Sequence, residues 1–360
     1  MDKFQTIANE VIELLKQLIS IESLSKQEDA AADLMESFLK NKGLKTNRKM
    51  NNIWVWSADK VDSKPTILLN SHIDTVKPSS KWTYAPFEPT LEGDVLYGLG
   101  SNDAGGPLVS LLATFLLLSE TEQPFNLVYA ATAEEEISGR NGVAQLFEEI
   151  GTIDLGIIGE PTQMQMAVAE KGLLVLDCEA KGKAGHAARD EGLNAIYEAL
   201  QDIEWFKNYQ FPEVSDLFGP VKMTVSQINA GTQHNVVPDS CKFVVDVRLN
   251  EKYSNQQAAD IIQSKVKCTA TPRSTRLNSS YIPLDHPVVN RGLEIGRTYY
   301  GSPTTSDQAL MSFTTLKMGP GDSARSHTAD EYIKLSEIKE GVKIYYELLN
   351  GLEIRDYSKS

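Results

Sequence analysis

Apolar residues near the start of the chain recur at the spacing of an α-helix. They are Phe4, Ile7, Val11, Leu15 and Leu18. Residues three or four positions apart lie on one face of a helix, so this segment is expected to bury that face. Ser25 and Glu28 have the pattern of a capping box, which predicts a second helix that stops at Gly43.

Short apolar runs then alternate with helical patterns. The runs cover residues 66–69, 127–131, 155–158 and 315–318. Such runs are typical of strands that are covered on both faces, and helical patterns lie between them at 108–118 and 143–150. The sequence therefore predicts an α/β fold with a largely parallel sheet and helices on both sides.

The pattern changes between residues 171 and 280. Runs at 173–179, 221–228 and 243–249 alternate between apolar and polar residues, as half-exposed antiparallel strands do, and helical segments at 194–206 and 256–266 accompany them. We interpret 171–280 as a smaller α+β domain inserted into a larger one. The larger domain would comprise 1–170 and 281–360, and would resume with a helix over 288–300.

Composition and charge narrow the class of protein. The 360 residues are 41% hydrophobic and 23% charged, as in ordinary globular chains. A net charge of -14 argues against nucleic acid or an anionic membrane as partner. No stretch has the roughly 20 apolar residues of a membrane span, and the charged amino terminus does not resemble a secretory signal, so we expect a cytoplasmic protein. The three cysteines have no metal-binding or disulfide spacing.

Ligand-type residues follow the predicted buried strands. In an open α/β sheet the crevice beyond the carboxyl ends of the strands is the usual binding site. His72 and Asp74 are separated by one residue, so an extended chain points both to the same side. A metal-binding histidine usually gives its other ring proton to a carboxylate, and Asp74 is placed for that role. A satisfied buried pair is the ordinary alternative for so short a motif.

Further carboxylates and one more histidine occur at other loops. Asp103 lies in a glycine-dense turn before a helix, where an N-cap is the simpler interpretation, and the turn lacks the ending of a phosphate-binding loop. Glu134, Glu135 and Glu136 directly follow a buried strand. Adjacent carboxylates repel one another, so they indicate bound cations rather than a solvated acidic loop.

Glu160 ends another strand, and His327 lies in a turn near the end of the chain. Together these loops supply two imidazoles and several carboxylates without a thiolate. Zinc accepts nitrogen and oxygen ligands, so two zinc ions that share one carboxylate would fit this set.

The chain resembles the di-zinc family of acetylornithine deacetylases, succinyl-diaminopimelate desuccinylases, aminoacylases and carboxypeptidase G. The motifs that carry the resemblance are, in order, SHIDTV, LYGLGSNDAGG, TAEEE, IIGEPT, GKAGHAA, HNVVPD, TSD and GPGDSARSHTADEY. The resemblance spans nearly the whole chain. It implies a zinc-dependent exopeptidase-like mixed sheet flanked by helices, with an inserted lid that commonly mediates dimerisation.

The resemblance also implies roles for individual residues around two Zn²⁺ ions, for which Co²⁺ or Mn²⁺ could substitute. His72 and Glu160 match ligands of one ion, Glu136 and His327 match ligands of the other, and Asp103 matches the bridging carboxylate. Asp74 matches the residue that orients the first histidine. Glu135 matches the general base, which takes a proton from the attacking water and passes it to the departing nitrogen. Glu134 would be structural.

Further matches lie in the inserted domain and in the TSD motif. His186 matches a histidine that supports the oxyanion, often in the partner subunit's site, although by itself a histidine in such a turn would be an ordinary surface residue. Substrate contacts would come from Asn235, Arg248, Thr305 and Ser306. The guanidinium of Arg248 offers the planar fork that suits an α-carboxylate.

The expected activity is removal of the N-acyl group from an amino acid, as in arginine biosynthesis. Glu at position 160 is associated with deacylases and carboxypeptidases more than with aminopeptidases. We expect acetylornithine first, with acetyl- or succinyl-citrulline and succinylornithine as further candidates. Arg189, Arg276 and Arg325 are candidate partners for a succinyl carboxylate.

Other functions remain open. A dipeptidase, a carboxypeptidase or a succinyl-diaminopimelate desuccinylase is the alternative within the family, and a binding protein without turnover is disfavoured because Glu135 and every expected ligand are present. The sequence departs from the family in one turn, because Ala104 directly precedes Gly105 and Gly106 where Met-Lys usually does. That change leaves the ligands intact but alters the neighbouring wall of the site.

Overall fold

The computed structural model describes residues 3–189 and 191–354 and divides the chain into two compact units. The first unit comprises Met1–Val168, Tyr281–Tyr300 and Ser306–Ser360, and the second comprises Ala169–Ser280 and Gly301–Thr305. The boundaries expected from the sequence, 170/171 and 280/281, lie within two residues of these. The exception is the short segment 301–305, which returns to the second unit because it pairs with Lys171.

The first unit is built on a mixed sheet in which the central strands are parallel. Their order is β1-β2-β6-β3-β7-β17-β8-β15, and β16 also pairs with β8. The strands are β1 (Thr46–Lys49), β2 (Asn52–Trp56), β3 (Thr66–His72), β6 (Asn126–Thr132), β7 (Leu155–Ile158), β8 (Met166–Glu170), β15 (Ser280–Tyr281), β16 (Tyr299–Ser302) and β17 (Thr315–Lys317). β6, β3, β7 and β17 run parallel, whereas β2 and β8 pair antiparallel with this group.

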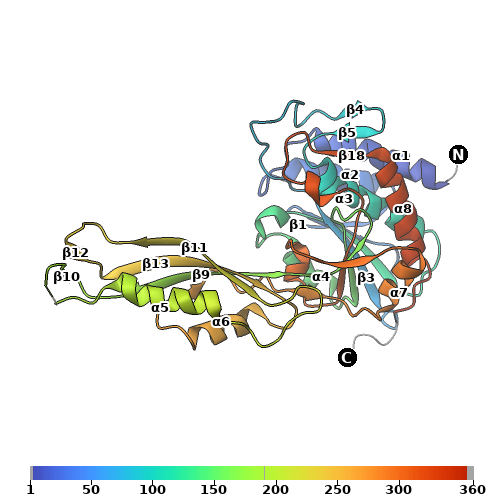
Figure 1. Ribbon diagram of the computed structural model, residues 1–360. Coiled ribbons are helices and arrows are strands. Elements are labelled where there is room, and N and C mark those ends of the chain that lie inside the picture. The colour runs from blue at the N-terminus through green and yellow to red at the C-terminus, as the bar shows by residue number, and fades with distance from the viewer. Residues whose placement is uncertain (1–2, 190, 355–360) are drawn as a thin grey trace. The chain divides into compact units, whose positions relative to one another are not determined.

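Helices cover both faces of this sheet, which confirms the expected fold class (Figure 1). The helices of the first unit are α1 (Lys3–Ile19), α2 (Asp29–Asn41), α3 (Gly106–Leu118), α4 (Phe147–Ile150), α7 (Pro287–Glu294) and α8 (Leu335–Leu349). α3 packs on β3 and β6 and is itself covered by α1 and α8. On the other face, Leu68 and Val128 pack with Ile150 of α4. A small sheet of β4 (Thr90–Glu92), β5 (Val95–Tyr97) and β18 (Tyr332–Lys334) completes the unit.

α3 is apolar because it lies in the core of the unit. Together with the turn before it, Ser101–Leu118 has a mean hydropathy of 1.2, and it is the one helical segment among the described residues that is long and apolar enough to cross a membrane. However, 89% of this window is buried inside the protein. Packing against the sheet on one side and against α1 and α8 on the other therefore accounts for its composition.

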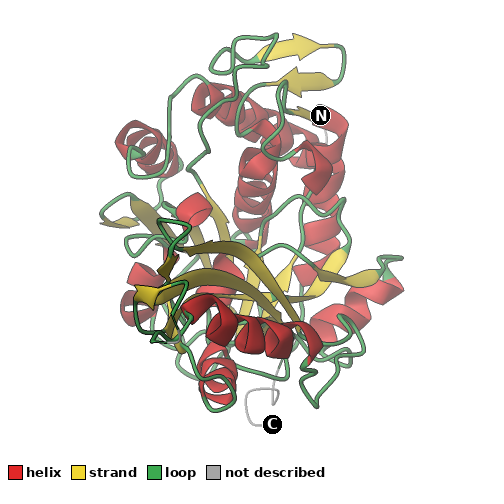
Figure 2. Cartoon of the chain, turned by 60° about the vertical axis from the view of Figure 1, so that its left-hand side comes forward, coloured by secondary structure: helices red, strands yellow, loops and turns green. Residues whose placement is uncertain are grey.

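The second unit is a four-stranded antiparallel sheet with two helices on one face (Figures 1 and 2). The strand order is β11-β13-β9-β14. Its elements are β9 (Gly172–Lys181), β10 (Gly185–His186), α5 (Ala195–Asn208), β11 (Lys222–Ala230), β12 (Val236–Val237), β13 (Ser240–Leu249), α6 (Asn255–Gln263) and β14 (Thr269–Pro272). Alternate residues of β9 and β13 are buried beneath α5 and α6, as the period of two in the sequence predicted.

Three local predictions were wrong. The helix expected over 288–300 ends at Glu294, because Gly296 adopts φ +79 and the chain then enters β16. The helix expected over 143–150 is a 3₁₀ turn followed by the four-residue α4. The capping box of Ser25 and Glu28 does not form. Instead, both side chains bind residues near the ends of β3 and β6.

Candidate metal centre

The parallel strands of the first unit bring their carboxyl ends, and the loops that follow, to one edge of the sheet. β3 ends at His72, β6 leads through Thr132 to Glu135 and Glu136, and β7 leads to Glu160. Because these strands pair in parallel, the residues after them lie side by side. Asp103 and His327 reach the same place from loops elsewhere in the unit.

Five of the predicted residues form two groups that share Asp103. His72, Asp103 and Glu160 form the first group, and Asp103, Glu136 and His327 form the second; within each, the candidate ligand atoms lie within 4.8 Å of one another. Asp103 Oδ1 is 3.2 Å from His72 Nε2, while Asp103 Oδ2 is 3.6 Å from His327 Nε2. The two oxygens of Asp103 therefore face different histidines, as a bridging carboxylate requires.

The donor set fits two divalent cations. Each group offers one imidazole nitrogen and carboxylate oxygens, and the described residues place no cysteine in either group. Nitrogen and oxygen donors of this kind suit zinc and other first-row divalent ions. Several carboxylates held this close repel one another, so bound cations would stabilise the arrangement.

Asp74 anchors the loop after β6 as well as the ring of His72. The Nδ1 atom of His72 is 2.9 Å from the backbone oxygen of Asp74 and 3.4 Å from its carboxylate. The carboxylate itself accepts the backbone N–H groups of Glu135 at 3.0 Å and Glu136 at 3.2 Å, and the hydroxyl of Ser25 at 2.7 Å. One buried side chain thus holds both a first-group histidine and the backbone of two acidic residues.

Glu134 adopts a different role from its two neighbours. Its φ of +56° turns the chain sharply before the 3₁₀ turn of Glu135–Ile137. Its carboxylate accepts hydrogen bonds from the backbone and side chain of Asn141, and its own N–H donates to Glu28. This geometry matches the structural role expected for it, and it leaves Glu135 and Glu136 directed toward the two groups.

Burial and charge shift the pKa values of the site in opposite directions. Burial, together with nearby carboxylates, raises the pKa of Glu135 well above its ordinary value, and burial also raises the pKa of Glu136. Burial opposes ionisation of Asp103 as well, but its hydrogen bond with His72 holds the pKa of Asp103 below its usual value. The charged forms of Glu135 and Glu136 are therefore disfavoured in the protein, whereas the charged form of Asp103 is favoured.

The two histidines are drawn toward their charged forms. Burial disfavours a charged His72, but hydrogen bonds with Asp103 and Asp74 raise its pKa well above the ordinary value. A hydrogen bond with Glu136, at 2.8 Å, raises the pKa of His327 to about 9. The negative charge around both imidazoles favours a proton on each ring, and it would also attract a metal cation.

Asp103 is not an N-cap, and no motif in the sequence indicated which residue holds it. α3 begins at Gly106 with Gly105 as its N-cap, and Asp103 lies in the preceding turn, Ser101–Gly105. Gly100 enters this turn at φ +75, and a Cβ atom there would lie 2.6 Å from the side chain of Thr75. Glu331, which we did not single out in the sequence, accepts the backbone N–H of Asp103 at 2.9 Å. Burial raises the pKa of Glu331 to about 8.

The TSD motif contributes a further buried acid. Asp307 is buried, accepts the hydroxyl of Thr132 at 3.3 Å, and adds to the charge that raises the pKa of Glu135. Ser306, expected to contact substrate, accepts the N–H of Gln308 and caps the 3₁₀ turn Asp307–Leu310. The hydroxyl of Thr305 donates to the backbone oxygen of Lys171 at 3.3 Å. The motif itself was visible in the sequence, but its acid was not assigned a role.

The remaining predicted residues lie in the second unit. His186 and Asn235 are neighbours in the β10–β12 ribbon, where the N–H of Ala187 donates to the backbone oxygen of Asn235 at 3.0 Å. The Nδ1 atom of His186 accepts the N–H of Ala188 at 3.2 Å, which places the proton of a neutral ring on Nε2. Arg248 makes a two-point contact with Asp246, at 2.8 and 3.1 Å.

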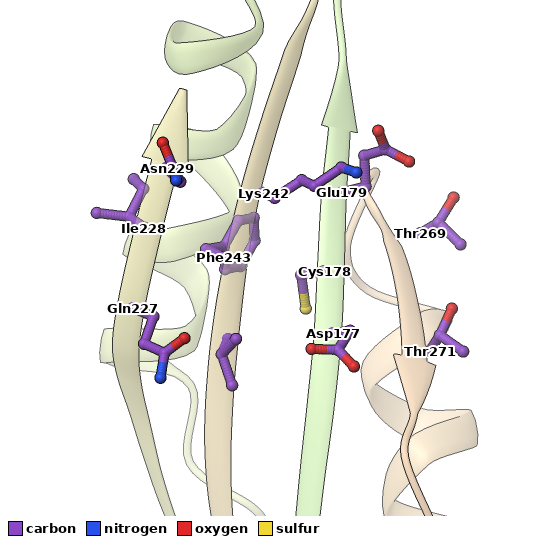
Figure 3. A pocket seen from close by; sticks show the side chains of 11 residues that line it. Asp177, Cys178, Glu179, Gln227, Ile228, Asn229, Lys242, Phe243, Thr269 and Thr271 are labelled. Atoms are coloured by element: carbon purple, nitrogen blue, oxygen red, sulfur yellow. The ribbon is translucent and has the colours of Figure 1, made fainter. Parts of the chain in front are cut away.

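Two sizeable hollows lie away from the two candidate ligand groups. A groove of about 520 Å³ lies on the face of the second unit's sheet opposite its helices, lined by residues such as Asp177, Glu179 and Lys242 (Figure 3). A wider hollow of about 810 Å³ is lined by residues of the segments 187–189, 192–197 and 230–238. Volume alone therefore does not locate the chemistry of this protein.

Known proteins share both the sequence pattern and the fold. The model of peptidase family M20/M25/M40 matches residues 68–351. A succinyl-diaminopimelate desuccinylase from Orientia tsutsugamushi (strain Ikeda) is 24% identical, with 94% of this chain and 95% of the relative aligned. A protein named as a LysW-lysine/LysW-ornithine hydrolase, from Pyrobaculum aerophilum, is 28% identical, with 93% of this chain and 95% of the relative aligned.

A solved structure gives the same picture for the fold. A Bacillus subtilis protein described as a dinuclear metal-binding peptidase from the M20 family superimposes with a TM-score of 0.72. The match covers 96% of this chain and 98% of that chain, at 16% sequence identity. At this low sequence identity, the structural similarity shows a shared fold and nothing further.

Proposed function

The chain belongs to peptidase family M20/M25/M40, and from that premise we propose that it removes the N-acyl group from an N-acylated amino acid with two bound zinc ions. One observation carries the proposal. Asp103 faces two histidines with its two carboxylate oxygens, and Glu135, whose Oε2 atom is 4.0 Å from His72 Nε2, stands beside them. Two ligand groups with a separate proton acceptor are what metal-assisted amide hydrolysis needs.

His72, Asp103 and Glu160 would hold one ion, and Asp103, Glu136 and His327 the other. When bound, the ions would polarise the amide carbonyl and make water a stronger acid. Glu135 would take a proton from the attacking water on its carboxylate and deliver that proton to the departing nitrogen. Burial raises the pKa of Glu135 above its ordinary value, so its carboxylate is a stronger base than an exposed one.

Asp74 and His186 would act by orientation and by hydrogen bonding. Asp74 fixes the backbone of Glu135, so the carboxylate of Glu135 starts from a set position. His186 carries its ring proton on Nε2 when neutral, since Nδ1 accepts a backbone N–H. An Nε2–H donor can stabilise the negative charge that develops on the carbonyl oxygen of the substrate.

For the substrate, we propose N-acylated ornithine or citrulline, with acetyl favoured over succinyl. A succinyl group would need a second cation, and Arg325, one of three candidates, is already bound to Glu337 in a two-point contact at 2.7 and 3.0 Å. Arg248 would bind the α-carboxylate of the substrate after its contact with Asp246 is broken. The relative named as a LysW-ornithine hydrolase supports an ornithine-type product, and the desuccinylase relative supports the alternative.

A panel of substrates tests this proposal. We would compare kcat/KM for acetyl- and succinyl-ornithine, acetyl- and succinyl-citrulline, succinyl-diaminopimelate and a dipeptide, each with added Zn²⁺. We expect the acetylated amino acids to be hydrolysed best. A dipeptide hydrolysed best would replace the deacylase by a dipeptidase, and no turnover of any amide with two metals bound would contradict the catalytic proposal itself.

We also propose that the second unit forms a homodimer surface. β11 is the edge strand of its sheet, with no partner strand on its outer side among the described residues, and exposes Ile228. The neighbouring α5 exposes Leu200 and Tyr197, the latter at 66% of its surface. An apolar helix face beside an open strand edge suits pairing with a second copy of the chain.

Mixing two inactive variants would test both the dimer and the position of His186. If His186 acts in the partner's site, His186→Ala chains mixed with Glu135→Ala chains should recover part of the activity, because one hybrid site keeps both groups. Light scattering would establish the dimer and its exchange of subunits. A dimer that exchanges subunits without recovering activity would mean that His186 acts within its own chain or has only a structural role.

A further inference from the structure

Glu331 is a buried carboxylate at the end of the segment that carries His327. Its surface is 2% exposed. Its Oε1 atom accepts the backbone N–H groups of Asn102 at 2.8 Å and Asp103 at 2.9 Å, and its Oε2 atom accepts that of Gly100 at 3.2 Å. Its backbone oxygen accepts a fourth N–H, from Gly98, at 3.0 Å. Glu331 thus accepts four backbone N–H groups from the segment between Gly98 and Asp103.

A second contact joins the same two segments. The side chain of Asn102, which is fully buried, accepts the N–H of Asp322 at 2.9 Å and donates to the backbone oxygen of Asp322 at 3.1 Å. It also lies 3.4 Å from the hydroxyl of Ser326, directly before His327. Asn102 and Glu331 therefore connect the turn of Asp103 to both ends of the loop that carries His327.

We propose that Glu331 is a positioning residue for the metal centre. Through backbone hydrogen bonds it would hold Asp103 in the bridging position and connect the turn of Asp103 to the loop that carries His327. This inference rests on the proposed two-metal function. Glu331 makes its contacts through backbone N–H groups, so it would act on the carboxylate of Asp103 by fixing the turn before it. Without these bonds the turn could relax, and the two oxygens of Asp103 would no longer face both groups at once.

The effect would appear in metal affinity rather than only in fold stability. Side chains that hold a metal ligand in place typically contribute 10- to 100-fold in metal affinity. We therefore expect Glu331→Ala to weaken Zn²⁺ binding by about 10- to 100-fold at both groups, because Asp103 belongs to both. Glu331→Gln retains one acceptor oxygen for two of the N–H groups, so its affinity should lie between those of Glu331→Ala and the wild type.

The second unit offers a matched control. Asp202 is also buried, and its carboxylate also accepts backbone N–H groups, from Lys267 at 3.0 Å and Cys268 at 2.7 Å. It lies in the second unit, whereas the metal-binding groups lie in the first. Asp202→Ala should lower the melting temperature of the metal-free protein, as Glu331→Ala should, but it should leave Zn²⁺ affinity unchanged.

The experiment is a competition between a chromophoric chelator and the metal-stripped, full-length protein for Zn²⁺, with melting curves of each metal-free variant. Weaker Zn²⁺ binding in Glu331→Ala, but not in Asp202→Ala, supports the proposal. Wild-type affinity in a folded Glu331→Ala protein overturns it. Equal loss in Glu331→Gln and Glu331→Ala also overturns it, because the negative charge of Glu331, rather than its hydrogen bonds, would then be responsible.

A second variant keeps the test decisive if Glu331→Ala does not fold. Asn102→Ala removes the other connection and leaves Glu331 in place, so it should weaken Zn²⁺ binding by a smaller factor. Wild-type affinity in both Asn102→Ala and Glu331→Gln would overturn the proposal. A wild-type protein that binds no Zn²⁺ would contradict the proposed function together with this inference, whereas two Zn²⁺ ions held equally well by every variant would contradict this inference alone.

Discussion

Acidic residues gather in both units, but in opposite environments. At the metal-binding groups of the first unit the side chain of Glu136 is 6% exposed, and burial raises its pKa. In the groove of the second unit the side chain of Asp177 is 53% exposed (Figure 3), and a two-point contact with Arg273 lowers its pKa. Asp177 is thus paired with a basic partner on an open sheet face.

The difference shows which charged clusters carry chemistry. The charge of an exposed carboxylate with a basic partner is balanced by that partner and by water, so it does not require a bound cation. Several buried acids that face one another cost free energy to ionise, and a cation or a shared proton relieves that cost. The burial of carboxylates close together, rather than cavity volume, therefore distinguishes the candidate active site of this protein.

The largest effect should come from Glu135, the proposed general base. Glu135→Gln should lower kcat by about 10²- to 10⁴-fold, the usual contribution of general acid–base catalysis. Metal content should stay at the wild-type value, because Glu135 is not among the grouped ligands. Glu179→Gln, on the exposed groove, is the control and should leave kcat unchanged. Undiminished turnover in a metal-loaded Glu135→Gln protein would remove Glu135 from the mechanism.

Metal binding should stabilise the first unit by several kcal/mol. A ligand present at 1,000 times its Kd stabilises the folded state by about 4 kcal/mol. Adding Zn²⁺ to metal-stripped protein should therefore raise the melting temperature markedly, and His327→Ala, which removes one imidazole, should reduce the rise. Calorimetric melting curves with and without Zn²⁺ measure it. The same rise in His327→Ala would mean that the ions bind elsewhere.

A buried histidine away from the metal-binding groups should make stability depend on pH. His286 caps α7, and burial lowers its pKa from 6.5 to about 4. Between pH 6.5 and 4 the imidazole of His286 is therefore protonated in the unfolded chain but neutral in the folded chain. Stability is lost as the pH falls through this range. The full loss corresponds to about 3 kcal/mol.

His286→Asn keeps a capping side chain but does not titrate. Urea unfolding at pH 7 and at pH 4.5 should show a smaller loss for this variant than for the wild type. Other groups that titrate in this range are common to both proteins and cancel in the comparison. Equal losses in the two proteins would mean that His286 is not the group responsible.

The smallest effect should come from the exposed pair of the groove. Arg273 and Asp177 form an exposed ion pair that water screens, so Arg273→Ala should shift the midpoint of urea unfolding only slightly. Added salt should reduce the difference further. Urea unfolding at low and high salt measures both. A large shift of the midpoint would show that the groove is not the solvated surface that its exposure indicates.

Much of the candidate site could be predicted from short stretches of sequence. His72 and Asp74 are two residues apart at the end of an apolar run, and three glutamates directly follow another. Apolar runs that alternate with helical patterns predicted parallel strands. The parallel pairing of β3 with β6 and β7 confirmed that prediction. These signals are local, because the period of a strand and the identity of the residue that ends it are written in consecutive positions.

Other features depend on residues far apart in the chain. The helix α7 ends earlier than predicted because Gly296 adopts a positive φ and the chain then forms β16. β16 pairs with β8, a partner that no local sequence pattern reveals. Ser25 and Glu28 looked like a cap, yet their side chains bind Asp74 and the backbone of Glu134. A hydrogen bond to a distant loop satisfies these groups as well as a local cap would, so tertiary packing decides between them.

Taken alone, the sequence determined the residue types of the centre and the strand ends from which most of them project, because strand period and residue identity are local properties. Only the tertiary structure decided that the two oxygens of Asp103 face His72 and His327, and that Glu331 supports Asp103 from the far end of the His327 loop. The physical reason is that a bridging carboxylate is defined by the directions of its two oxygens. Those directions depend on hydrogen bonds between segments that meet only in the folded protein.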